Sequence, residues 1–169
     1  FRGIEEGISY HQYCTTGVEA IEETMMPMAL LKLSGIIEDA GFLAVPQKRN
    51  QLITADPEDH SGNDRMRDEF YRAFGDEGLV FSSFDVCDDR CADIKNIGDY
   101  DVIILGGGHV PTQNKFFKKI GLMEKIHEFD GLLLALSAGS MNSARVVYAI
   151  PELEGEASDP QYQRWLSGL

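Results

Sequence analysis

The chain has 169 residues, of which 43% are hydrophobic and 25% are charged, and its formal net charge is −13. This size supports one hydrophobic core, so we expect a single domain over residues 1–169. The acidic balance excludes nucleic acid as a partner, because phosphate backbones need a basic footprint, and no basic cluster or long apolar run points to a membrane.

The first 50 residues give a weak pattern. Apolar spacing predicts helices over 17–26 and 28–40, separated by Pro27, while 41–46 is either a strand or a loop. From Gln51 onward, short apolar runs alternate with amphipathic stretches, which is the pattern of βαβ units. The sequence therefore predicts an α/β fold, with a mostly parallel sheet and helices on both faces.

The region after residue 50 divides into strands and helices in turn. Strands are predicted over 51–55, 79–86, 101–105 and 131–136. The helix after the first strand has one apolar face, made of Met66, Phe70, Tyr71 and Phe74, and Gly75 and Gly78 end it. A short helix ends near Ile97. Thr112 is the expected N-cap of a helix with an apolar stripe, made of Phe116, Phe117, Ile120, Met123 and Ile126. We expect a last helix over 138–147.

Ser137 lies between the strand over 131–136 and this last helix, with small residues on both sides. A nucleophile elbow needs such neighbours, because its tight turn tolerates little bulk beside the exposed hydroxyl. Ala135 stands where the G-x-S-x-G pattern has its first glycine. The backbone amide of Ala138, at the start of the helix, is one predicted donor to an oxyanion. Alternatively, Ser137 is only a helix N-cap.

Three glycines, Gly106, Gly107 and Gly108, follow the strand over 101–105. Ligands of parallel sheets bind beyond the carboxyl ends of the strands, so an amide of Gly107 or Gly108 is the second predicted oxyanion donor. The alternative is an ordinary turn. A phosphate-binding P-loop is rejected because no Gly-Lys-Ser/Thr follows.

The segments Asp101-Val102-Ile103-Ile104-Leu105-Gly106-Gly107-Gly108 and Leu136-Ser137-Ala138-Gly139-Ser140-Met141-Asn142 resemble the dipeptidase E and cyanophycinase family of serine peptidases. The resemblance runs from about residue 51 onward and includes the bacterial type 1 glutamine amidotransferase-like branch. It implies a class I glutamine amidotransferase-like fold, Ser137 as nucleophile, and amides of Gly108 and Ala138 as the oxyanion hole. True amidotransferases carry Cys at the elbow, so Ser137 weakens a glutaminase function.

The family takes its general base from a His on a strand downstream of the serine, whereas all four histidines here precede Ser137. We therefore expect a truncated, inactive chain, cut at the C-terminus and at the N-terminus, with the base beyond Leu169. His109 is the rival base, because it adjoins the glycine turn, or else it lines the pocket. The other histidines are His11, which gives no signal, His60 in a turn, and His127 at a helix end.

The resemblance also implies an acidic triad member, for which the stretch after the last helix offers candidates. Glu152 and Glu154 are preferred there over Glu156 and Asp159. Gln113 and Asn142 are either substrate contacts or structural hydrogen-bonding residues. Arg145 and Arg164 are candidates for binding an acidic substrate, on the basis of their charge alone.

The sequence thus favours a cytoplasmic serine hydrolase that cleaves an amide bond in a small peptide or amide through an acyl-enzyme at Ser137. We expect no cofactor and no metal, since the thiols Cys14, Cys87 and Cys91 lack a zinc-binding pattern and are typical of reduced cysteines. The alternatives are a non-catalytic domain that binds a small ligand and a glutamine amidotransferase-like protein. The oligomeric state is open, with a homodimer as one option.

Overall fold

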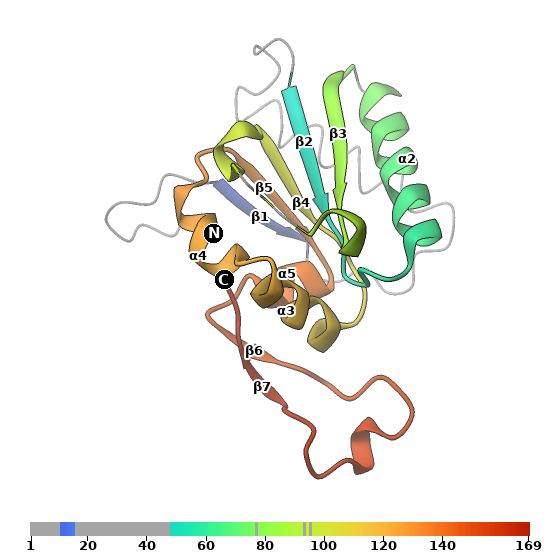
Figure 1. Ribbon diagram of the computed structural model, residues 1–169, viewed down its shortest axis with the longest axis vertical. Helices are drawn as coiled ribbons and strands as arrows, with labels where there is room; N and C mark the ends of the chain where they lie inside the picture. The colour runs from blue at the N-terminus through green and yellow to red at the C-terminus, as the bar shows by residue number, and fades with distance from the viewer. Residues whose placement is uncertain (1–10, 16–47, 77, 93, 95) are drawn as a thin grey trace.

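The computed structural model describes residues 11–15, 48–76, 78–92, 94 and 96–169. The helices expected over 17–26 and 28–40, and the segment 41–46, lie outside these ranges. Within the described residues the chain forms one five-stranded sheet, flanking helices and a separate two-stranded hairpin (Figure 1).

All strand pairs of the five-stranded sheet are parallel, and the strand order is β1-β5-β4-β2-β3. The strands are β1 (His11–Thr15), β2 (Lys48–Ile53), β3 (Phe81–Cys87), β4 (Val102–Leu105) and β5 (Leu132–Leu136). The four strands predicted after residue 50 are therefore confirmed, with ends shifted by a few residues. β1 was not predicted, and it adds an edge strand beside β5.

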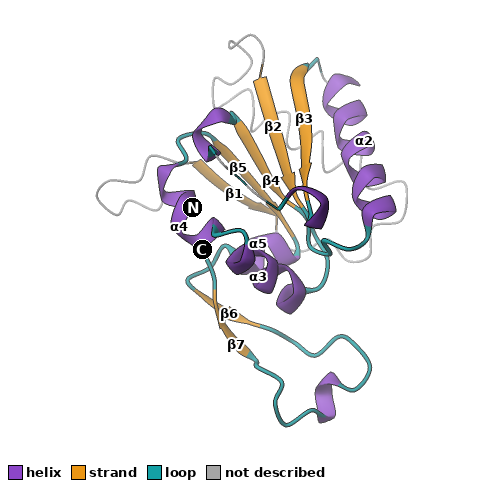
Figure 2. Cartoon of the chain, in the orientation of Figure 1, coloured by secondary structure: helices purple, strands orange, loops and turns teal. Residues whose placement is uncertain are grey.

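Helices connect the strands and follow the last of them (Figure 2). The α-helices are α2 (His60–Asp76), α3 (Val110–Lys119), α4 (Leu122–Lys125) and α5 (Ala138–Asn142). The shorter 3-10 helices are η2 (Asp89–Cys91), η3 (Ile97–Asp99), η4 (Ile126–Glu128) and η5 (Glu156–Ser158). The helix predicted with a long apolar stripe divides at Gly121, whose φ of +66° separates α3 from α4.

Alternate side chains along the strands face opposite layers of the core. On one face Leu52 and Ile104 pack in a cluster with Phe74 of α2. On the other face Ile53 and Leu105 pack in a cluster with Phe117 of α3. Because apolar residues on both faces are covered, the predicted α/β fold with helices on both faces of a parallel sheet is confirmed.

The helix predicted over 138–147 is wrong in its second half. α5 ends at Asn142, and β6 (Val146–Tyr148) follows and pairs antiparallel with β7 (Trp165–Ser167). The side chain of Asn142 is fully buried and hydrogen-bonded to α3, so the chain is anchored there and then turns away. β-branched Val146 and Val147 then suit a strand better than a helix.

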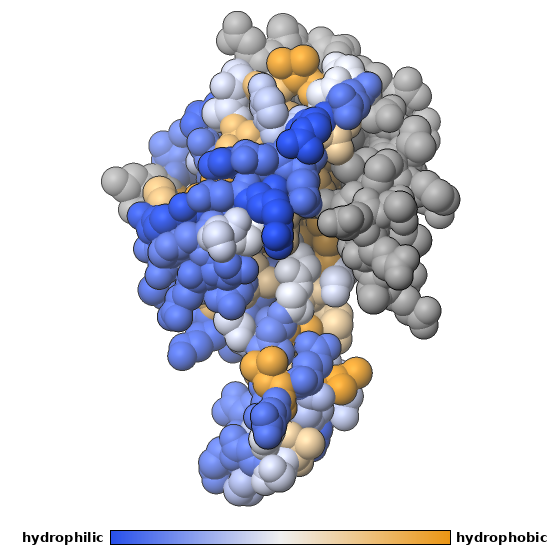
Figure 3. Space-filling view, turned by 90° about the vertical axis from the view of Figure 1, so that its right-hand side faces the viewer, coloured by the Kyte–Doolittle hydropathy of each residue, from blue (hydrophilic) through white to orange (hydrophobic). Residues whose placement is uncertain are grey.

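The β6–β7 hairpin projects from the body of the molecule (Figures 1 and 3). Its inner face packs Val147 against Val110 of α3 and Ala138 of α5. Apolar side chains lie exposed on the projecting part, namely Val146, Tyr148, Ile150, Leu153 and Trp165. The hairpin is thus held to the body of the molecule through α3 and α5.

Candidate active site

Ser137 has an unusual backbone. Its φ of 46° and ψ of −113° make it the one non-glycine residue with positive φ in the described part of the chain. Such a conformation costs on the order of 1–3 kcal/mol and persists only where the surrounding structure imposes it. The side chain is exposed at the carboxyl end of β5, so the hydroxyl is accessible to a substrate.

The strain at Ser137 follows from how α5 packs on β4. A Cβ placed on Gly139 would lie 2.5 Å from the carbonyl oxygen and 2.7 Å from the Cβ of Leu105. Only glycine therefore permits this approach, and the chain must turn sharply between β5 and α5 to make it. The helix starts at once, since the amide of Met141 donates to the carbonyl of Ser137 at 3.1 Å.

The glycine turn after β4 lies directly beside Ser137. A Cβ placed on Gly107 would lie 3.3 Å from the Cβ and 3.9 Å from the Oγ of Ser137. Gly108 has a φ of +149°, and its Cβ would lie 2.6 Å from that of Ala55, which follows β2. The structure thus brings together Ser137, Gly107 and Gly108 at the carboxyl ends of neighbouring strands.

In the described part of the chain the predicted oxyanion donors are not bound to other protein groups. Among the residues that the structure describes, no acceptor receives a hydrogen bond from the backbone amides of Gly107, Gly108 or Ala138. An amide that lacks a partner in the protein is available to a ligand or to solvent. These three amides are therefore the groups that could meet an anion beside Ser137.

His109 is the residue before α3, and its side chain makes no capping hydrogen bond. Instead it contacts two parts of the chain. Its Nδ1 lies 2.8 Å from Oγ1 of Thr112, and its Nε2 lies 3.0 Å from Oε1 of Glu156. The second contact is at ion-pair distance without the alignment of a good hydrogen bond. His109 rather than Thr112 precedes the helix, so the predicted N-cap is wrong: Pro111 lies in the first turn and the Thr112 hydroxyl faces His109.

Glu156 is the acidic residue that contacts His109. Its other carboxylate oxygen accepts hydrogen bonds from the amides of Leu153 (3.0 Å) and Glu152 (2.9 Å). The Leu153 amide, followed by the Glu152 amide and His109, holds the pKa of Glu156 below its ordinary value, against burial that would raise it. Glu152 and Glu154, which were preferred from the sequence, have exposed side chains. The sequence held no signal for Glu156, because a capping box has Ser or Thr three residues before the Glu, and Leu153 stands there.

Gln113 and Asn142 belong to a buried network of amide side chains. Gln113 Nε2 donates to the carbonyl of Gly106 at 2.7 Å, and Asn142 Nδ2 donates to Gln113 Oε1 at 3.0 Å. Asn114, which sequence reasoning missed, donates to Asn142 Oδ1 at 3.0 Å and to the carbonyl of Ser167 at 2.9 Å. All three side chains are almost completely buried, so these contacts match the structural alternative.

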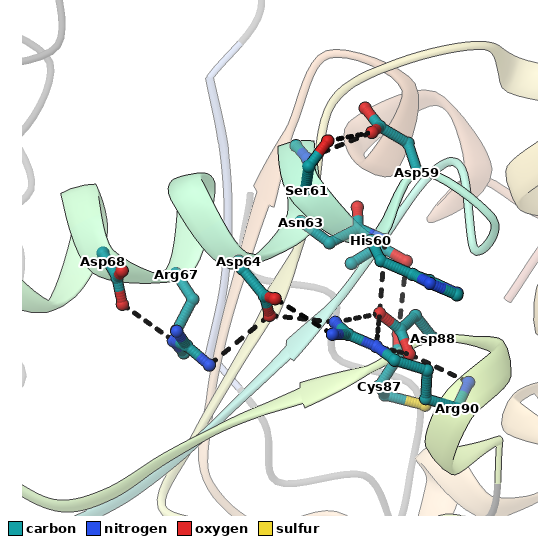
Figure 4. A network of polar contacts seen from close by, with 12 residues as sticks. Asp59, His60, Ser61, Asn63, Asp64, Arg67, Asp68, Cys87, Asp88 and Arg90 are labelled. Atoms are coloured by element: carbon teal, nitrogen blue, oxygen red, sulfur yellow. Dashed lines mark hydrogen bonds and ion pairs between the residues drawn. The ribbon is translucent and has the colours of Figure 1, made fainter.

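A second polar cluster lies at the same edge of the sheet, after β3 (Figure 4). Asp88 is 1% exposed and accepts hydrogen bonds from Arg90, which also binds Asp64 of α2. Among the described residues, His60, Asp88 and Asp89 are the one group with the proximity of metal ligands. A guanidinium already neutralises Asp88, so this cluster is built as an ion-pair network.

The remaining candidates are a histidine, two arginines and the cysteines. His127, Arg145 and Arg164 are exposed, and Arg164 stacks over Tyr162. Cys87 is buried and Cys91 is exposed. The backbone of β1 is described, but not the side chains that it carries.

The sequence matches no protein-family model and no curated protein. In the part of the chain that the structure describes, no helix is long and apolar enough to cross a membrane.

Proposed function

We propose that the chain is the nucleophile-bearing domain of a serine hydrolase of the peptidase type, with Ser137 as the nucleophile. The observation that carries this proposal is the backbone of Ser137, with φ 46° and ψ −113° beneath an exposed hydroxyl. A nucleophile elbow presents its serine on such a strained turn between a strand and a helix. An ordinary N-cap serine has extended backbone angles and a side chain that accepts a hydrogen bond from its own helix, and Ser137 has neither.

The topology of the sheet supports a site at this position. From β2 the chain moves outward to β3, then returns past β2 to β4 and continues to β5. Parallel α/β sheets bind ligands beyond the carboxyl ends of the strands, where the order reverses. Gly108 and Ala55 meet there, next to Ser137. This arrangement agrees with the class I glutamine amidotransferase-like fold implied by the resemblance to dipeptidase E and the cyanophycinases.

The proposed reaction is the hydrolysis of an amide bond in a small peptide or amide. Ser137 Oγ attacks the carbonyl carbon as the base takes the hydroxyl proton, and the amides of Ala138 and of Gly107 or Gly108 stabilise the oxyanion. The amine then leaves with that proton from the base. Water then hydrolyses the acyl-enzyme. In the described part of the chain no side chain hydrogen-bonds to Ser137 Oγ, and the base that the resemblance implies is a histidine on a strand downstream of the serine. Within this chain the alternative base is His109 with Glu156 as its acidic partner.

A fluorophosphonate probe tests this function on the complete gene product. The probe phosphorus bonds to Ser137 Oγ as fluoride leaves and the base takes the hydroxyl proton. We expect wild-type protein to be labelled and Ser137→Ala to lose all labelling. Ser158→Ala, which removes an exposed hydroxyl in η5, is the control and should label normally. Labelling that survives in Ser137→Ala would exclude Ser137 as the nucleophile.

A second candidate function is the binding of a small carboxylate or amide without catalysis. It is favoured by one observation, that His109 already faces Thr112 and Glu156 rather than lying free. In this case wild-type protein stays unlabelled, while calorimetry detects a small carboxylate whose binding weakens when Gly107→Val blocks the turn. Loss of labelling in His109→Gln, by contrast, would identify His109 as the base.

A further inference from the structure

We propose that Gln113 is a positioning residue for the oxyanion donors, and that Asn142 holds it in place. This inference rests on the proposed function, since it assigns a role in the same site. Both side chains are fully buried, so neither of them touches a substrate. They act on the site through the glycine turn, which lies beside Ser137.

The hydrogen bonds of Gly106 fix the peptide from which the turn begins. Its amide donates to the carbonyl of Ile53 at 2.9 Å, and its carbonyl accepts from Gln113 Nε2 at 2.7 Å. The carbonyl of Gly106 and the N–H of Gly107 share one trans peptide plane, so they point in opposite directions. Because Gln113 holds the carbonyl toward the core, the N–H of Gly107 is directed away from it.

Such a constraint is needed because the turn consists of three consecutive glycines. Glycine has no preferred sign of φ, so an unrestrained turn would sample several orientations of its amides. Oxyanion stabilisation depends on donors that are already oriented before the reaction. The bond to Gln113 is the one hydrogen bond from a side chain to this turn in the described part of the chain.

Asn142 connects this constraint to the other half of the site. It lies at the end of α5, the helix that follows Ser137, and its Nδ2 donates to Gln113 Oε1 at 3.0 Å and to the carbonyl of Val110 at 3.1 Å. One buried chain of hydrogen bonds therefore runs from the elbow helix through α3 to the glycine turn. The nucleophile and its oxyanion donors are in this way fixed relative to each other.

The test compares Gln113→Met with Asn114→Leu in the complete gene product. Asn114 is equally buried and bonds to the same Asn142, but it does not reach the glycine turn. Both variants should melt at a lower temperature than wild type. We expect Gln113→Met to lower the limiting first-order rate of fluorophosphonate labelling by about 10- to 100-fold with little change in the half-saturating probe concentration. Asn114→Leu should label at the wild-type rate.

Two results would overturn the inference while leaving the proposed function intact. One is a folded Gln113→Met protein that labels at the wild-type limiting rate, and the other is an equal loss of rate in Asn114→Leu. If Gln113→Met does not fold, Gln113→Glu keeps the acceptor for Asn142 and regains the donor only when its carboxyl is protonated. Its rate relative to wild type should then rise as the pH falls, and a constant ratio would contradict the role. Absence of labelling in wild type would instead refute the proposed function itself.

Discussion

Two substitutions at position 137 separate the strain of the backbone from the chemistry of the hydroxyl. Ser137→Ala and Ser137→Gly both remove the Oγ, but only glycine adopts φ 46° and ψ −113° without a Cβ clash. We expect Ser137→Gly to have a free energy of unfolding about 1 kcal/mol higher than that of Ser137→Ala. Urea denaturation of both variants measures this difference, and equal stabilities would show that the turn is not strained.

The carboxyl of Glu156 should make the stability of the hairpin loop depend on pH. Its pKa is held below the ordinary value, first by the Leu153 amide and then by the Glu152 amide and His109. A depressed carboxyl pKa contributes stability above the unfolded-state pKa, and this contribution is lost as the pH falls through the folded-state pKa. We expect Glu156→Gln to melt at a lower temperature than wild type at pH 7.

The difference between Glu156→Gln and wild type should shrink as the pH falls below the ordinary Glu pKa of about 4.3 and through the lower folded-state pKa, because the native carboxyl then becomes protonated. Melting curves at a series of pH values measure it. Glu154→Gln, in the same loop with an exposed side chain, is the matched control and should leave the melting temperature unchanged. A difference that stays constant from pH 7 to pH 3 would contradict this role for the Glu156 carboxylate.

The packing of α5 on β4 predicts a large difference between two glycine positions. Alanine at Gly139 would place its Cβ against the backbone of Leu105, whereas alanine at Gly75 in α2 meets nothing within 4 Å. We expect Gly139→Ala to destabilise the protein by about 1–3 kcal/mol and Gly75→Ala to stabilise it by up to about 1 kcal/mol. Chemical denaturation compares them, and a neutral Gly139→Ala would mean that α5 can move away from β4.

Elements whose residues carry their own pattern could be predicted from the sequence. The apolar run of β5, the amphipathic face of α2 and the small residues around Ser137 each determine local structure without help from distant residues. The end of α5 depends on a distant contact, because the side chain of Asn142 is bound to Gln113 of α3, 29 residues earlier. The wrong cap has a local reason, because the Thr112 hydroxyl faces His109, three residues before it.

β1 in the fold and Glu156 in the candidate site could not be predicted from the sequence, and the reason is the same for both. The five residues of β1 have no strong apolar alternation, and they form a strand by pairing with residues 132–136. Glu156 stands among several acidic residues of similar appearance, and only its contacts with His109 and with the Leu153 amide distinguish it. Neither property is visible without the fold.

At the scale of the whole molecule, Arg90 joins α2 to the end of β3. It binds Asp88, which is 1% exposed, and Asp64, whereas Arg67 binds only partly exposed carboxylates. Burial raises the pKa of Asp88, but the hydrogen bonds from Arg90 hold this pKa below its ordinary value. Arg90→Met would leave a buried carboxylate unpaired, so we expect it to lower the melting temperature by several degrees and more than Arg67→Met. Equal effects in thermal melts would show that Asp88 finds another partner.

The position of β1 at the edge of the sheet has a consequence for biosynthesis. Its partner strand, β5, is about 120 residues further along the chain. At typical translation speeds β1 is synthesised roughly 6–25 s before residue 136. During this interval β5, the one strand that pairs with β1 in the described part of the chain, does not yet exist, so this pair cannot form until translation has passed Leu136. A nascent chain stalled before that point should therefore be a preferred client of chaperones that recognise unpaired strands.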